Sequence, residues 1–213
     1  MQHHPPDEYL IDLAAGAASD GVKLLLETHL AMCPPCQTLR ADIEQVGGIL
    51  LEEEASAGLT PMPELGSLRA PAVRMVRPVV PAGAGDVPDP LRNFVGASFD
   101  ALAWRTVWPG VQELPVPGID RREGLKLLRI RQGMALPNHT HEGDELTLVL
   151  KGGYKDATGH YQAGDIALAD EHISHQPKAD WGDACICLTA VERPLRFNGL
   201  IARTVSRLFI RNS

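Results

Sequence analysis

The fold is decided by the stretch Gly133-Met-Ala-Leu-Pro-Asn-His139-Thr-His141-Glu-Gly-Asp-Glu145-Leu-Thr-Leu-Val-Leu-Lys-Gly152. It carries His139 and His141 two residues apart, directly before a run of β-forming residues. Side chains at positions i and i+2 of a strand point to the same face of a sheet. His139 and His141 can therefore bind one metal ion together, and the stretch predicts a β-structure with a metal site.

Short apolar segments surround this stretch from about Phe94 onward, and turn residues such as Gly152-Gly153 and Ala163-Gly164-Asp165 separate them. The segments are residues 104–108, 125–130, 146–150, 165–168 and 185–190. Short strands at even spacing are typical of an antiparallel sandwich or barrel. The C-terminal part is therefore expected to be an antiparallel β-domain.

The N-terminal part follows the period of an α-helix instead. Helices are expected at residues 7–17, 20–31 and 35–54, and the third carries Leu39, Ile43, Val46 and Leu50 at 4-3-4 spacing. A bundle of this size buries little apolar surface. A metal ion that joined its helices would supply stability that the small core lacks.

The motif His29-Leu-Ala-Met-Cys33-Pro-Pro-Cys36 supplies three ligands for such an ion. His29 and Cys33 lie one helical turn apart, and the tight Cys-x2-Cys turn lets two thiolates reach one tetrahedral ion. The fourth ligand would be His3 or His4, and a Cys2His2 set would make a closed, structural zinc site. The alternative is a redox pair, but such a pair should follow a strand, and the segment before this one is helical in pattern.

Proline and glycine break the periodicity between the two parts. Residues 57–93 hold seven prolines, and Pro81-Ala-Gly-Ala-Gly85 has the composition of a flexible linker. The sequence predicts a two-domain α+β chain with a helical domain at residues 1–78, a linker at 79–93 and a β-domain at 94–213. One short helix is expected within residues 63–76. The linker would let the two domains move independently.

The net charge of −7 is concentrated in the first domain. Residues 1–56 carry ten acidic and two basic side chains, which gives −8, and residues 57–213 carry 17 and 18, which gives +1. An acidic domain favours a basic protein partner and disfavours direct nucleic-acid binding. No apolar run approaches the ~18 residues of a membrane span, and the start lacks the pattern of a signal peptide. We therefore expect a cytoplasmic protein without a membrane partner.

The four cysteines form two close pairs, which favours metal binding over a disulfide framework. In a strand, the Cα atoms of Cys185 and Cys187 would lie about 6.6 Å apart. This is the outer limit for a disulfide. We interpret them as buried and unreactive; if they were partly exposed near a metal, their oxidation would be a conformational signal.

From Gly133 to Gly152 the chain matches every position of the first motif of the cupin family. The resemblance implies that Glu145 joins His139 and His141, and that one later histidine completes the set. His172 and His175 are the candidates, and we favour His175. These donors suit Zn²⁺, which we favour, and also Mn, Fe or Ni. A cupin dioxygenase or isomerase with a helical appendage is the alternative function, because such an ion can bind substrate in an open position.

An acidic helical domain with His-x3-Cys-x2-Cys, followed by a cupin, resembles the ChrR-type zinc-containing anti-sigma factors over nearly the whole chain. The resemblance implies that His4 is the fourth zinc ligand beside His29, Cys33 and Cys36. It implies that the first domain binds one extracytoplasmic-function (ECF) sigma factor in a 1:1 complex. The cupin domain would sense a small-molecule or oxidative signal, which in this branch is linked to singlet oxygen. No catalytic residue is expected.

Overall fold

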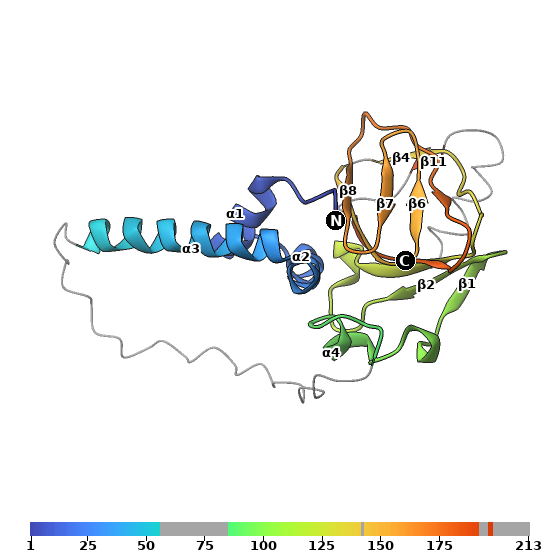
Figure 1. Ribbon diagram of the computed structural model, residues 1–213, viewed down its shortest axis with the longest axis horizontal. Helices are drawn as coiled ribbons and strands as arrows, with labels where there is room; N and C mark the ends of the chain where they lie inside the picture. Colours follow the sequence, from blue (N-terminus) through green and yellow to red (C-terminus); the bar gives the residue numbers. More distant parts are fainter. Residues whose placement is uncertain (56–84, 142, 192–195, 198–213) are drawn as a thin grey trace.

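The computed structural model describes residues 1–55, 85–141, 143–191 and 196–197 (Figure 1). A helical N-terminal part stands beside an antiparallel β-domain, which confirms the predicted α+β fold class. The predicted short helix at 63–76 lies outside the described residues, as do residues 79–84 of the predicted linker. Of that linker, residues 85–93 are described. Val87 and Leu91 are fully buried there, so the packed β-domain begins before residue 94.

Three helices form the N-terminal part: α1 (Asp7–Ala15), α2 (Asp20–Met32) and α3 (Pro34–Ala55). The Ser19 side chain accepts a hydrogen bond from the N–H of Val22 and caps α2, as its position before the helix predicts. Gly16 ends α1 with a positive φ of 71°, a conformation that glycine adopts without strain. Cys33 separates α2 from α3, and Pro34 opens α3, where its missing N–H costs nothing.

Within the described residues, the β-domain has three antiparallel sheets. The main sheet has the order β1-β2-β3-β10-β5-β8, a second has the order β7-β6-β9, and a third pairs β11 with β4. The strands are β1 (Arg105–Trp108), β2 (Val111–Pro115), β3 (Lys126–Ile130), β4 (His139–Thr140), β5 (Glu145–Lys151), β6 (Gly153–Lys155), β7 (His160–Gln162), β8 (Ile166–Ala169), β9 (Lys178–Ala179), β10 (Cys185–Val191) and β11 (Arg196–Phe197). In the described part of this domain, the α-helix α4 (Arg92–Val95) and the 3-10 helix η1 (Phe99–Ala101) precede β1, and a second 3-10 helix, η2 (Arg121–Glu123), lies between β2 and β3.

Both faces of the main sheet are buried at its centre, where β10 is buried at all seven positions. Its alternate residues serve different cores. Cys185 and Cys187 pack inside the β-sandwich with Tyr154, while Ile186 and Leu188 belong to a larger core on the opposite face. This division follows from the period of two in a strand.

The larger core is shared between the two parts of the chain. It contains Leu25 and Leu26 of α2 together with Leu146 and Leu148 of β5. The helix α2 contacts both β10 and β5. The helical part is therefore docked on the outer face of the main sheet, which differs from the expectation of two independently moving domains. Burial of these leucines is the physical reason, since each stabilises the docked state by roughly 1.5–3 kcal/mol relative to exposure.

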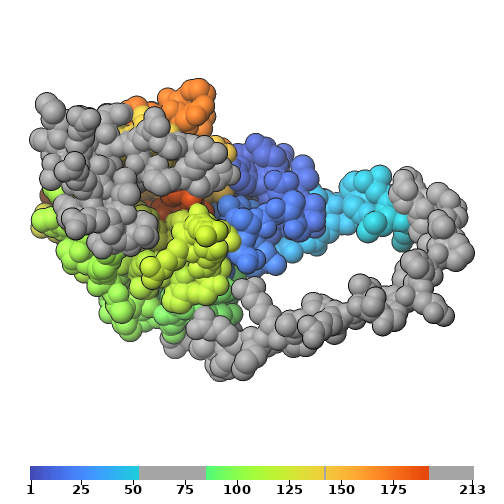
Figure 2. Space-filling view, turned by 180° about the vertical axis from the view of Figure 1, so that it is seen from behind, coloured from blue at the N-terminus to red at the C-terminus, as the bar shows by residue number. Residues whose placement is uncertain are grey.

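The helix α3 extends away from the rest of the molecule (Figure 1), and the space-filling view from behind shows the same projection (Figure 2). Leu39 and Ile43, near its start, pack against the core. Val46 and Leu50 continue the same 4-3-4 stripe but are 56% and 57% exposed. Of the four apolar residues in the predicted stripe, only the first two are therefore packed against the core.

Candidate metal centres

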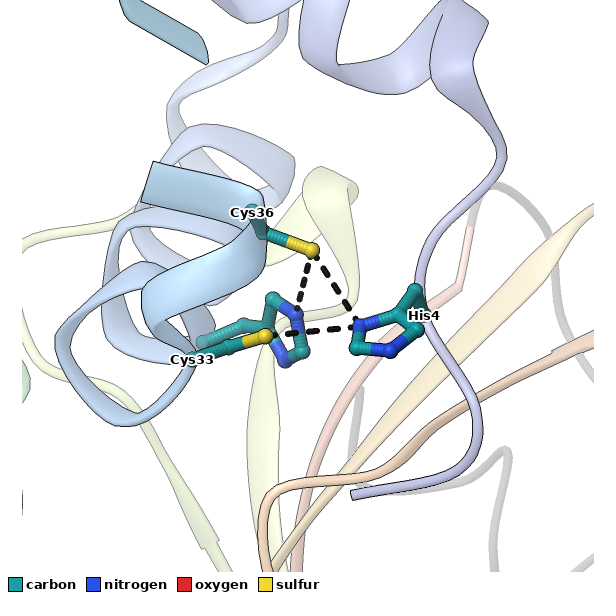
Figure 3. Close-up of side chains that lie close together, drawn as sticks. His4, Cys33 and Cys36 are labelled. Carbon is teal, nitrogen blue, oxygen red and sulfur yellow. Dashed lines mark hydrogen bonds between the residues drawn. The ribbon is translucent and has the colours of Figure 1, made fainter. Parts of the chain in front are cut away.

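Four predicted ligands meet where the N-terminal segment passes the α2–α3 junction (Figure 3). They are His4, His29, Cys33 and Cys36, whose ligand atoms all lie within 4.8 Å of one another. Nδ1 of His4 is 3.3 Å from both sulfurs, and Nε2 of His29 is 3.3 Å from Sγ of Cys36. His3 is not in this group, because its ring packs on Tyr161 at a centroid distance of 4.6 Å.

Hydrogen bonding determines which nitrogen of His29 is free to bind a metal ion. Nδ1 lies 2.9 Å from the carbonyl oxygen of Gly164, and this oxygen can only accept. Nδ1 therefore carries the proton, and Nε2 presents its lone pair to the cluster. Burial lowers the pKa of His29 to about 4, so the ring stays neutral, as a metal ligand requires.

The donor set suits a tetrahedral Zn²⁺ ion. Zn–S bonds of about 2.3 Å and Zn–N bonds of about 2.0 Å place sulfur and nitrogen ligands about 3.5 Å apart, close to the 3.3 Å observed here. Burial, together with the neighbouring Cys33, raises the pKa of the Cys36 thiol to about 12. A bound cation would reverse this shift by stabilising the thiolates.

The second group lies in the β-domain, where Nε2 of His175 is 3.0 Å from Nε2 of His141 and 3.1 Å from Nε2 of His139. Nδ1 of His139 donates to the carbonyl of Pro137, and Nδ1 of His175 donates to Asp156. Both Nε2 atoms therefore direct lone pairs toward each other across 3.1 Å. A cation among the three rings would remove this repulsion, so the arrangement suits a metal ion.

Glu145 lies beside this group and outside the set of three histidines. Its Oε2 is 3.3 Å from Nδ1 of His141, a contact close enough for an ion pair but not aligned as a hydrogen bond. Its Oε1 accepts a hydrogen bond from Thr147. Of the two candidates for the later histidine, His175 is buried in the group, while the side chain of His172 is 82% exposed.

Asp156 was not identified from the sequence. It lies in the turn after β6, and its Oδ2 accepts a 2.8 Å hydrogen bond from Nδ1 of His175. Its side chain is only 1% exposed. Burial alone would raise its pKa, but hydrogen bonds from His175 and Thr158 lower the pKa to about 2. Asp156 therefore stays ionised and fixes the ring of His175.

An apolar cavity opens beside this second group. His139, Glu145 and His175 line it on one side, and the rest of its wall is mainly apolar, including Leu128, Ile130, Leu136, Tyr154 and Cys187. Lys126 supplies a cationic group. The two groups thus differ: the first offers four ligands that can fill the shell of one ion, with His4 exposed at the surface, and the second faces a space that a small molecule can enter.

Cys185 and Cys187 are free thiols in the sandwich core, with sulfurs 3.5 Å apart. Both are essentially buried. The hydrogen bond with Cys185, followed by burial, raises the pKa of Cys187 well above its ordinary value. The expectation of buried cysteines is confirmed, although Cys187 also reaches the cavity wall.

The described helices do not include one that is long and apolar enough to cross a membrane. The fold and its two clusters define a class of protein: a Cys/His metal-site helical domain joined to a cupin-like β-domain.

Comparison with known proteins gives the family. A family model described as the ChrR cupin-like domain matches residues 93–193. Anti-sigma-E factor ChrR of Cereibacter sphaeroides is 39% identical over 98% of this chain and 98% of its own length. A crystal structure of Rhodobacter sphaeroides SigE in complex with the anti-sigma ChrR matches with a TM-score of 0.70 and 36% identity, covering 89% of this chain and 98% of that one. The chain belongs to the ChrR family of anti-sigma factors.

Family membership confirms the resemblance inferred from the two motifs. It also confirms that the chain is a regulator and not a cupin enzyme, which sets aside the dioxygenase or isomerase alternative.

Proposed function

We propose that this anti-sigma factor inhibits a cognate ECF sigma factor by binding it through the helical N-terminal domain in a 1:1 complex. The family membership supports this most directly, since the solved relative is a complex of SigE with ChrR. A chain that acts on a sigma factor works in the cytoplasm. The cupin domain, in this proposal, receives the signal that ends inhibition.

The proposed role of His4, His29, Cys33 and Cys36 is to hold one Zn²⁺ ion that fixes the shape of the helical domain. The four ligands come from the N-terminal segment, from α2, from the residue between α2 and α3, and from the first turn of α3. An ion bound to all four would fix the angle at which α3 leaves the body. Such closed sites contribute directly to folding energy.

The proposed binding surface is the distal half of α3. Val46, Ile49 and Leu50 are each more than half exposed on a helix that extends away from the body. Exposed apolar residues of this size, grouped on one helix, mark a protein interface. The surrounding domain carries −8 over residues 1–56, so it suits a partner with basic surfaces. The occupant we propose is the sigma factor, whose surfaces for promoter DNA are basic.

The proposed sensor is the cupin site, with a divalent metal held by His139, His141, Glu145 and His175. Glu145 would have to turn from His141 toward the ion to complete this set. Zn²⁺ is our first choice of metal, and Mn, Fe or Ni suit the same donors. The adjoining cavity is mainly apolar and favours a small apolar molecule as the signal, such as a product of singlet-oxygen stress.

The shared leucine core affects how this proposal is tested. Deleting the cupin domain would expose the leucines of α2 that pack on the main sheet, so a truncated chain is a poor probe. We would instead compare full-length variants in a pull-down with the cognate ECF sigma factor, with R. sphaeroides SigE as a second probe. Cys33→Ser should abolish capture of the sigma factor, and His175→Asn should retain it. Unchanged capture by Cys33→Ser would refute the proposed zinc role.

A further inference from the structure

The N-terminal segment, residues 1–4, runs along the turn between β7 and β8 in the β-domain. The carbonyl oxygen of His3 accepts a 3.1 Å hydrogen bond from the N–H of Ile166, the first residue of β8. The strand β8 is at the edge of the main sheet, so this bond covers a backbone group at the open edge. The next residue, His4, is a proposed zinc ligand. Its position therefore depends on this attachment.

Asp165 in the same turn holds the segment with its carboxylate. Oδ1 accepts hydrogen bonds from the N–H of Gln2 at 2.7 Å and of His3 at 3.2 Å, and Oδ2 accepts one from Gln162 at 2.9 Å. Asp165 is only 3% exposed. Burial alone would raise its pKa, but these backbone hydrogen bonds lower it. The carboxylate is therefore ionised, and its hydrogen bonds are of the stronger, charge-assisted kind.

Gly164 contacts a second zinc ligand. Its carbonyl oxygen accepts the Nδ1–H of His29, and this bond leaves Nε2 free to bind metal. Gly164 has a φ of +94°, and a Cβ there would come within 2.7 Å of the Met1 side chain. A residue with a Cβ would strain the turn through this positive φ, whereas the flexible Met1 side chain could move aside. One turn of the cupin domain, residues 162–165, thus positions two of the four ligands. It holds the backbone of the segment that carries His4, and it orients the ring of His29.

We propose that the 162–165 turn is part of the N-terminal metal centre, and that retention of the metal by the helical domain depends on this turn. The inference rests on the proposed zinc site and adds to it a dependence on the other domain. Asp165 acts here as a positioning residue: it holds the segment that carries His4 while Gly164 orients His29. Partners of this kind commonly change metal affinity by 10–100-fold.

The same turn is linked to the cupin cluster through the main sheet. The strand β8 begins directly after Asp165 and pairs with β5, where Ala169 lies opposite Glu145. A displacement of β8 caused at the cupin site would shift the acceptors of His29 and of the N-terminal segment. Because coupling between sites is reciprocal, loss of the N-terminal metal should in turn loosen β8.

A second contact between the two parts of the chain offers a matched control. The carboxylate of Glu123 accepts a hydrogen bond from the N–H of Gly21 at the start of α2, and neither residue touches a metal ligand. Glu123→Gln and Asp165→Asn are the same chemical change in two contacts across one domain boundary. General loosening of the boundary would affect both variants alike, whereas our proposal concerns Asp165 alone.

The experiment uses the full chain loaded with Co²⁺, since thiolate-to-cobalt charge transfer reports only the site that contains cysteine. Loss of this absorbance is followed after addition of excess chelator. We expect Asp165→Asn to lose the metal about tenfold faster than the parent chain. Glu123→Gln should stay within about twofold, because surface hydrogen bonds away from such a site have small effects.

Equal rates for Asp165→Asn and the parent chain would overturn the proposal, as would equal acceleration by both variants. Retention of cobalt at the cupin site, counted as metal per chain, checks that Asp165→Asn is folded. If the parent chain showed no thiolate-to-cobalt band at all, the proposed zinc site itself would be wrong. If the band appeared and only the variant rates were unaltered, the zinc site would stand and the role of the turn would be refuted.

Discussion

The two histidine-containing clusters use similar ligands but differ in what surrounds them. The N-terminal cluster takes two sulfurs and two imidazoles from residue 4 and from residues 29–36, and the ligand atoms all lie within 4.8 Å of one another. The cupin cluster has three imidazoles held on a rigid β-framework, with Glu145 beside it and an apolar cavity in front. A closed set of ligands can only hold a structure together, whereas an open set can also respond to a molecule.

The two clusters also differ in the hydrogen bonds that hold their histidine rings in place. In the cupin cluster, His139 and His175 donate to Pro137 and Asp156 of the same domain. In the N-terminal cluster, His29 donates to Gly164 of the other domain. The cupin cluster is therefore supported within its own domain, whereas the N-terminal cluster is supported partly by the cupin domain.

The largest effect is expected from removing a ligand of the closed site. Cys36→Ser should eliminate the N-terminal metal and weaken sigma binding by more than about 100-fold, because the bundle loses the ion that joins its helices. Titration calorimetry with the cognate sigma factor measures this. Cys185→Ala, which changes a buried cysteine that the clusters do not use, is the control and should bind normally. Similar losses in both variants would mean that misfolding is the cause.

The second effect tests the open site. His175→Asn should reduce the metal content from two ions to one per chain, while sigma affinity changes by less than about threefold, since the substituted ring is remote from α3. Elemental analysis and calorimetry on the same sample give both values. Release of the sigma factor by the inducing stress should be lost. A variant that kept two metals would contradict our assignment of His175.

A smaller effect is expected on the proposed binding surface of α3. Leu50→Glu should weaken sigma binding by about 10–100-fold, as expected for an apolar residue central to an interface. Unfolding free energy should change by no more than about 0.5 kcal/mol, because the side chain is already exposed. Gln45→Glu adds the same charge on an exposed position of the same helix and serves as the control. Equal weakening by both would indicate a charge effect and not an apolar contact.

The smallest effect concerns the support of the cupin metal. Asp156→Asn should lower the affinity of that site about tenfold, because a neutral amide oxygen accepts the Nδ1–H of His175 more weakly than a carboxylate does. Competition with a metal indicator measures the change. The cobalt–thiolate signal of the N-terminal site should be unaffected, which separates this variant from Asp165→Asn. An unaltered affinity would show that Asp156 serves the fold alone.

Much of the fold could be predicted because its signals are local. The apolar stripe of α3, the Ser19 cap and the prolines after Cys33 each act within a few residues, and the observed helices begin and end close to the expected positions. The strand β2 was not predicted. Its residues Gln112 and Glu113 interrupt the apolar run, and Glu113 is buried only because Arg105 and Lys126 pair with it from the neighbouring strands. Such compensation depends on sheet register and is invisible in the sequence.

The site residues, like the strands, could be predicted only where the deciding signal lies within a few residues. The spacing of His29, Cys33 and Cys36 predicts that they lie together, because a helix and a tight turn fix their separation. The choices between His3 and His4, and between His172 and His175, depend on contacts made by distant residues such as Tyr161 and Asp156. Docking of α2 on the main sheet was missed as well, since an amphipathic helix does not reveal which surface covers it.

The most direct test compares sigma affinity in three full-length proteins: the parent chain, Cys36→Ser and His175→Asn. Calorimetric titration with the cognate ECF sigma factor, alongside a metal count for each protein, is the measurement. We predict two metals and tight 1:1 binding for the parent, one metal and no measurable binding for Cys36→Ser, and one metal with near-parental binding for His175→Asn. Tight binding by Cys36→Ser, or lost binding by His175→Asn, would contradict the assignment of a structural role to the first site and a sensing role to the second.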